Sequence, residues 1–159
     1  YIPPRKGKNH ILRIIRDLLE FEPDNSQTNL NSGLIQLTNA VKRRCTAFLV
    51  SDFLTTDYFN SLKLAKSKHD LIAIKCFDPM ETELPKLGLL KMFNPENSER
   101  NWVNTNSSAT RKHYKDWWNN LNDNFKLYCK KSGVDQVSLS TADNYAKPLM
   151  KMFKQRLSR

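Results

Sequence analysis

The chain has 159 residues and a mass of 18.6 kDa, which is the size of one domain. Hydrophobic residues make up 39% and charged residues 26%, proportions that exclude an intrinsically disordered chain. The net charge of +10 favours contact with nucleic acids or acidic surfaces without selecting a partner. The longest apolar run, CTAFLV, is far shorter than the roughly 18 residues that span a bilayer, so we expect no membrane span and a cytoplasmic protein.

Two helices are predicted at the start of the chain. Apolar residues at a spacing of three and four predict a helix over residues 8–21, ended by Pro23. Thr28 or Asn29 is the expected N-cap of a second helix. The residues predicted to face inward are Ile11, Ile14, Ile15, Leu18 and Leu19 in the first helix, and Leu30, Leu34, Leu37 and Val41 in the second.

A strand-helix-strand unit follows. Residues 45–50 form an unbroken apolar run, as expected of a strand that is covered on both faces in a parallel sheet. A helix around Tyr58 and Leu62 comes next, and residues 71–77 repeat the buried-strand pattern before Asp78. This order predicts two parallel strands joined by a helical crossover.

The second half contains a hairpin and two more helices. Residues 84–105 predict a β-hairpin around the turn residues NPENSE, and an apolar stripe over residues 114–128 predicts a helix that ends at Gly133. Residues 134–139 predict a strand, and Thr141 or Asp143 is the expected cap of a last helix. Its predicted inward residues are Leu149, Met150, Phe153 and Leu157. The alternation of helices and strands indicates an α/β layered sheet.

Polar residues follow the predicted strands at the edge where ligands bind in open α/β sheets. Thr28, in the loop before the second helix, and Asp52, after the first strand, offer oxygen ligands of the kind that suit Mg2+. The alternative is that Thr28 only caps a helix and that Asp52 caps the helix after its strand, and spacing alone favours this alternative. A hydrolase that uses Asp52 and Asp78 lacks an identifiable base or nucleophile.

Other patterns point to weaker candidates. Basic residues beside Trp117 and Trp118 suit a nucleic-acid groove, although both tryptophans also belong to an amphipathic stripe and the cations are dispersed over several helices. Three widely spaced cysteines favour reduced thiols over a disulfide framework. No histidine stands at a metal-ligand spacing from a cysteine, so neither a zinc site nor a Cys-His nucleophile is expected. The basic clusters are Arg5, Lys6 and Lys8; Lys42, Arg43 and Arg44; and Arg111, Lys112 and Lys115.

Five stretches together resemble the bacterial domain of unknown function 58 family. They are IPPRKGKNHILRIIRDLLEFEP, QTNLNSGLIQL, RRCTAFLVSDFL, HDLIAIKCFDPMETELPKLGLLKMFNPENSE and VSLSTADNYAKPLMKMFKQR. The resemblance implies that residues 1–159 are a single domain, the C-terminal portion of a von Willebrand factor A-like domain. The implied fold is a doubly wound, mostly parallel α/β sheet with helices on both faces, its N-terminal part absent, with the hairpin of residues 84–105 as an insertion. The start at Tyr1, without an initiator methionine, agrees with a fragment.

The same resemblance implies a site for Mg2+ or Mn2+ in the full-length protein, built from an Asp-x-Ser-x-Ser loop, a distant Thr and a distant Asp. Thr28 in QTNL and Asp52 in VSDF match the last two positions, and the first loop is expected upstream of Tyr1. Residues 24–28 imitate that loop, but a helix precedes them where a buried strand is required, so we treat the match as accidental. We therefore expect no metal to bind tightly to this fragment.

The family resemblance also implies a function. It indicates a non-enzymatic protein–protein interaction module that acts beside a MoxR-type AAA ATPase and its client proteins, and a basic nucleic-acid-binding module is the less favoured alternative. In a von Willebrand-like sheet the absent strand pairs beside residues 45–51. We therefore expect that strand to present an open apolar edge, through which the chain self-associates or pairs with its own upstream segment.

Overall fold

The computed structural model describes residues 2–22, 29–93 and 99–158. The observed order of helices and strands matches the predicted order and confirms an α/β fold, with a short 3-10 helix, η1, added after the second strand. The elements are α1 (Lys8–Glu20), α2 (Leu30–Ala40), β1 (Thr46–Ser51), α3 (Phe59–Lys68), β2 (Asp70–Phe77), η1 (Pro79–Glu81), β3 (Leu89–Phe93), β4 (Arg100–Asn104), α4 (Ser108–Ser132), β5 (Asp135–Ser140) and α5 (Ala146–Leu157).

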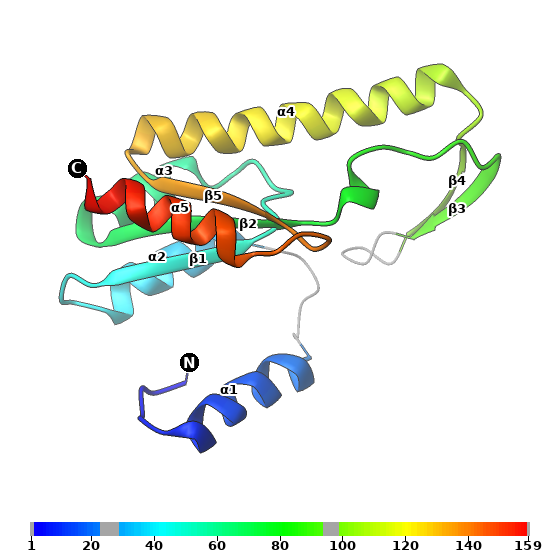
Figure 1. Cartoon of the computed structure of the whole chain (residues 1–159). Coiled ribbons are helices and arrows are strands. Elements are labelled where there is room, and N and C mark those ends of the chain that lie inside the picture. The colour runs from blue at the N-terminus through cyan, green and yellow to red at the C-terminus, as the bar shows by residue number, and fades with distance from the viewer. Residues whose placement is uncertain (1, 23–28, 94–98, 159) are drawn as a thin grey trace.

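The main sheet has the order β1-β2-β5, and all of its pairs are parallel (Figure 1). Thr46 pairs with Asp70 and Ile72 pairs with Asp135, so β2 lies in the middle. Since parallel neighbours need a crossover, α3 joins β1 to β2 and α4 leads into β5. The described strands of this sheet lie side by side in the order in which they occur along the chain.

Helices cover both faces of the sheet. On one face, α2, α3 and α4 pack on β1 and β2, and on the other, α5 packs on β2 and β5 (Figure 1). The middle strand β2 is therefore buried on both sides, as its unbroken apolar sequence predicts. The first core contains Leu34, Phe53, Tyr58, Leu62, Ala65, Leu71, Ala73, Phe125, Cys129 and Val134; the second contains Ile72, Ile74, Val137 and Met152.

The predicted cover of β1 on both faces is wrong. Its residues alternate between more and less exposed, and Phe48 and Val50 are 51% and 60% exposed. The reason is that α5 packs on β2 and β5, and it contacts β1 through the rings of Phe48 and Phe153, whose centroids are 6.3 Å apart. An apolar run predicts a strand, but the number of layers over it depends on the rest of the fold.

The predicted inward face of the first helix is also not buried. Helix α1 forms where its periodicity predicts, but none of its residues is buried and it lies apart from the sheet (Figure 1). Leu18 and Leu19 are 72% and 82% exposed. The amphipathic pattern thus predicted the helix correctly and its packing within the described chain wrongly. None of the described helices has the length and apolar character that crossing a membrane requires.

The start and inner face of α5 also differ from the prediction. The helix begins at Ala146, whose backbone N–H donates to Asn144 Oδ1 at 2.9 Å, so neither Thr141 nor Asp143 caps it. Met152 is the buried residue of α5 and Leu149 packs beside it. The other three residues predicted to face inward, Met150, Phe153 and Leu157, are exposed.

The predicted hairpin and long helix are confirmed. Strands β3 and β4 pair antiparallel beyond the end of the main sheet, beside the start of α4 (Figure 1), and the turn residues 94–98 lie outside the described residues. Helix α4 begins after Ser107, whose hydroxyl accepts from the backbone of Thr110, and ends at Gly133. Gly133 has φ 66°, a left-handed conformation that glycine adopts at helix ends without steric cost.

Candidate functional site

The carboxyl ends of β1, β2 and β5 meet at one edge of the sheet because the strands are parallel. This edge carries Asp52 after β1, Asp78 after β2 and Thr141 after β5. The hydroxyl of Thr141 donates to Asp78 Oδ2 at 3.0 Å, and its backbone N–H donates to the carbonyl of Phe77 at 3.0 Å. The structure thus brings Asp78 and Thr141 together, from positions 63 residues apart.

Asp52 is held at the surface by a tight turn. Its Oδ1 accepts from the backbone of Leu54 at 3.2 Å and from the hydroxyl of Ser51 at 3.3 Å. Phe53, between them, has φ 53°, a strained conformation for a bulky residue, and its side chain is fully buried against Phe125 with ring centroids 4.5 Å apart. Burial of Phe53 therefore holds the strained turn that presents Asp52. The carboxylate does not cap α3, which has no side-chain cap, so this part of the alternative interpretation is wrong.

Asp78 organises the short helix η1. Its Oδ1 accepts from the backbone of Met80 at 2.8 Å, and Glu81 Oε2 accepts from the backbone of Asp78 at 3.3 Å, which together form a capping box. The hydroxyl of Tyr114 on α4 donates to the Glu81 carbonyl at 2.8 Å. Burial, and then the charge of Glu81, raises the pKa of Tyr114, which keeps this donor protonated. Both Asp78 oxygens accept hydrogen bonds within the protein, so the role seen for Asp78 is structural.

The predicted metal ligands are only partly placed. Thr28 lies outside the described residues, and Asp52 is exposed on the edge. Within residues 2–22, 29–93 and 99–158, no group of three or more His, Cys, Asp and Glu side chains could hold a metal ion. The donor set around Asp52 consists of one carboxylate and the hydroxyl of Ser51, which is short of the six oxygen ligands that Mg2+ prefers. The described residues by themselves do not fit a complete divalent-cation site.

Lys75 on β2 is a candidate that sequence reasoning missed. Its side chain is 1% exposed, and its Nζ has no hydrogen-bond partner in the described part of the chain. The ammonium group lies 5.1 Å from the ring centroid of Trp118 and 5.8 Å from that of Phe125, both on α4. Burial lowers the pKa of Lys75, whereas the charges of Asp52 and Glu81 oppose this shift. The available signal was a lysine in the middle of an apolar strand.

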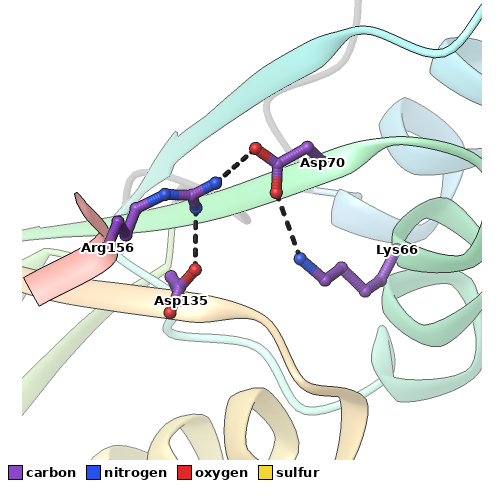
Figure 2. Close-up of polar contacts among 4 residues, drawn as sticks. All are labelled: Lys66, Asp70, Asp135 and Arg156. Carbon is purple, nitrogen blue, oxygen red and sulfur yellow. Dashed lines mark hydrogen bonds and ion pairs between the residues drawn. The ribbon is translucent and has the colours of Figure 1, made fainter. Parts of the chain in front are cut away.

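The opposite edge of the sheet carries a fully paired cluster of charges (Figure 2). Arg156 on α5 donates to Asp135 Oδ2 at 2.7 Å and also to Asp70. The Nζ of Lys66 on α3 lies 3.3 Å from Asp70 Oδ1. Burial raises the pKa of Asp70, but the hydrogen bond from Lys66 and the positive charges outweigh it and hold the pKa below its usual value. This cluster joins both helix layers to the sheet, which indicates a structural role.

Cys45 and His69 are neighbours in space although they stand 24 residues apart in the sequence, a contact that the sequence spacing did not predict. The Sγ of Cys45 lies 3.5 Å from Nδ1 of the buried His69. The two residues directly precede Thr46 and Asp70, which pair in the parallel register, so the sheet itself brings them together. A third group that orients the imidazole, as in nucleophilic sites, is missing from the described residues, because His69 Nε2 has no partner there.

The third basic cluster contributes to the fold. Arg111 donates from Nη1 to the carbonyls of Thr105 at 2.6 Å and Asn106 at 2.9 Å, and so ties α4 to the end of β4. Trp118 is buried in the core whereas Trp117 is partly exposed, so one of the two predicted stacking rings is unavailable to a nucleic acid. The first two basic clusters are exposed.

Comparisons with known proteins identify a family. Residues 1–121 match the family described as "Protein of unknown function DUF58". Uncharacterized proteins of Mycobacterium bovis and Mycobacterium tuberculosis are 28% identical to this chain over 90 residues, which is 55% of this chain and 28% of each relative. The matched stretch thus spans little more than a quarter of the length of these relatives. No solved structure matches the chain.

Proposed function

We propose that this chain, which belongs to the DUF58 family, is part of a non-enzymatic protein–protein interaction module that acts as an adaptor of a MoxR-type AAA ATPase. The observation that carries the proposal is the apolar side of α1. Ile11, Leu12, Ile15, Leu18 and Leu19 recur at helical spacing, and each is about half exposed or more. An amphipathic helix with its apolar side exposed is suited to docking in the groove of a partner.

The open edge of β1 supports the same proposal. Within the described sheet, β1 pairs only with β2, so its other side offers unpaired backbone groups beside the exposed Phe48 and Val50. Such an edge accepts a further strand from another chain or from the remainder of the same polypeptide. We propose that β1 is completed in this way, either by self-association or by a strand of the full-length protein.

The proposal extends to the sheet and the metal site of the full-length protein. We propose that the full-length protein completes a doubly wound, von Willebrand factor A-like sheet around β1, β2 and β5. Asp52 and Thr28, together with residues of the full-length protein, would then hold Mg2+ or Mn2+, and the ion would supply a coordination position for a carboxylate of a partner. The exposed Asp52 turn at the carboxyl edge supports this assignment.

The test of the adaptor function measures binding of the full-length protein to a purified MoxR-type ATPase from the same cell by biolayer interferometry. The double substitution Leu18→Ser and Leu19→Ser removes two exposed apolar side chains, and we expect at least about tenfold weaker binding. Arg16→Ser with Glu20→Ser, on the polar side of α1, is the matched control and leaves the net charge unchanged. Equal affinity of both double variants would remove α1 from the interface.

The absence of catalysis has its own test. Panels of hydrolase and nuclease substrates with Mg2+ or Mn2+ are expected to show no turnover by the full-length protein. Metal-dependent turnover that Asp52→Ala abolishes would contradict the proposal and assign an enzymatic role to the carboxyl edge. Binding to single-stranded or duplex DNA that falls steeply with salt would instead favour the nucleic-acid alternative.

A further inference from the structure

The ammonium group of Lys75 is buried, and the charges of Asp52 and Glu81 act on it without a hydrogen bond to it in the described part of the chain. The side chain is 1% exposed, and no hydrogen-bond partner for Nζ exists in the described part of the chain. A buried cation without a partner is costly unless it loses its proton or gains an anion. The two aromatic rings beside Nζ supply only a weak attraction in place of a carboxylate.

A hollow of about 430 Å³ lies next to this lysine, between α4 and the carboxyl halves of β2 and β5. Trp118, whose ring is 5.1 Å from the Lys75 Nζ, lines the hollow. Ser138 also lines it and is the register partner of Lys75 on β5. Lys75 is not itself a lining residue, so its buried amine lies beside the hollow, behind the lining on the sheet side.

We propose that this hollow binds a small oxyanion ligand, one that carries a phosphate or a carboxylate group, attracted by the buried charge of Lys75 beside the hollow. The amide groups of Asn119 and Asn122 and the hydroxyl of Ser138 line the same space and can donate hydrogen bonds to the anion. The site is independent of the docking surfaces on α1 and β1, and it stands whether or not the chain is an adaptor.

The charges around the hollow favour an anion over a cation. Lys126 lines the hollow, and its charge disfavours protonation of Lys75, so an anion placed between the two amines would relieve their repulsion. Asp123 is a carboxylate of the lining, but its side chain is 77% exposed and lies 3.9 Å from Lys126, at the rim. Lys75, in contrast, is shielded from solvent, which strengthens its attraction for an anion.

The test titrates the full-length protein with inorganic phosphate and with succinate by isothermal titration calorimetry at matched ionic strength. Wild type is expected to bind at least one of the two, and Lys75→Met is expected to bind at least about tenfold more weakly. Lys151→Met, an exposed lysine of α5, is the control for net charge and is expected to bind like wild type. Phosphate alone or succinate alone as the bound anion identifies the ligand class.

A second readout reports on Lys75 itself. In protein carrying 13C-labelled lysine, the Lys75 Cε resonance is the one missing from the Lys75→Met spectrum, and it is expected to shift when the anion binds. Lys75→Gln replaces Lys75→Met if the latter does not fold. The proposal is overturned if neither anion binds, if Lys75→Met binds as tightly as wild type, or if the Lys75 resonance does not respond to a bound anion.

Discussion

The charged side chains near the two ends of β2 differ in whether they have hydrogen-bond partners. Asp70, at the amino end, meets Lys66 and Arg156, and the latter also reaches Asp135 (Figure 2). Lys75, near the carboxyl end, lies beside two aromatic rings, and its Nζ has no hydrogen-bond partner in the described part of the chain. Buried polar groups in folded proteins are nearly always paired, so the paired end is explained by stability and the unpaired end calls for a ligand. The difference separates a structural edge from a candidate functional edge.

The largest expected effect comes from breaking the paired end. Arg156→Met removes the cation that bridges Asp70 and Asp135 while it keeps most of the apolar stem. We expect the free energy of unfolding to fall by about 2–3 kcal/mol, because two partly buried carboxylates lose their shared donor. Urea denaturation measures this change, and Lys154→Met, at an exposed position of α5, is the control. Equal stability of the two variants would show that the cluster is not a structural tie.

A gain in stability, and not a loss, is expected from a substitution near the carboxyl end of β2. Lys75→Met places an apolar side chain of similar length between Trp118 and Phe125, and we expect the anion-free protein to gain about 1–2 kcal/mol. Urea denaturation in a buffer without phosphate or carboxylate ions, with Lys151→Met as the control, measures this gain.

The stability gain of Lys75→Met should become smaller as the pH rises. The pKa of Lys75 is lowered in the folded state from 10.5, so the unfolded chain holds the extra proton between the two values. The stability of wild type therefore rises toward pH 10.5, and the advantage of Lys75→Met shrinks over the same range. A destabilised Lys75→Met, or an advantage that does not change with pH, would contradict an unpaired amine.

A smaller effect on stability is expected when acid protonates Asp70 at the amino end of β2. Since the folded pKa of Asp70 lies below 3.8, its ionised form stabilises the protein above that pH, and this stabilisation is lost as the pH falls through the folded value. Wild type should therefore lose up to roughly 1 kcal/mol more stability than Asp70→Asn on acidification from about pH 5 to about pH 3. Parallel pH profiles of the two proteins in urea denaturation would remove Asp70 as the acid-sensitive group.

The smallest effect on stability is expected from substitution of Lys66. Lys66→Met breaks the ion pair between the last turn of α3 and Asp70 at the start of β2 but leaves Arg156 in place. A loss of about 0.5 kcal/mol is expected, as for other pairs four residues apart. Thermal unfolding followed by circular dichroism, with Lys68→Met at a neighbouring exposed position as control, measures it. A loss as large as that of Arg156→Met would show that Lys66 and Arg156 contribute equally.

Much of the fold could be predicted from local patterns. The apolar strand around Ile72 and Ala73, the helix end at Gly133 and the hairpin all follow from burial periodicity and backbone preference, which neighbouring residues carry by themselves. Of the candidate metal ligands, Asp52 was located correctly after its strand, whereas its role in holding Leu54 was not foreseen. Thr28 lies outside the described residues, so its role stays a prediction.

Features that depend on contacts between distant segments could not be predicted in this way. The sequence determined the order of helices and strands, the family and the amphipathic character of α1, because each depends on residues that are close together along the chain. Only the tertiary structure decided that α1 is unburied and that one face of β1 is open. It also brought Cys45 to His69 and Arg156 to Asp70, and it buried Lys75 beside a hollow. Pairing of strands and coverage by helices fix these relations, and the pattern of a single segment carries no information about its partners.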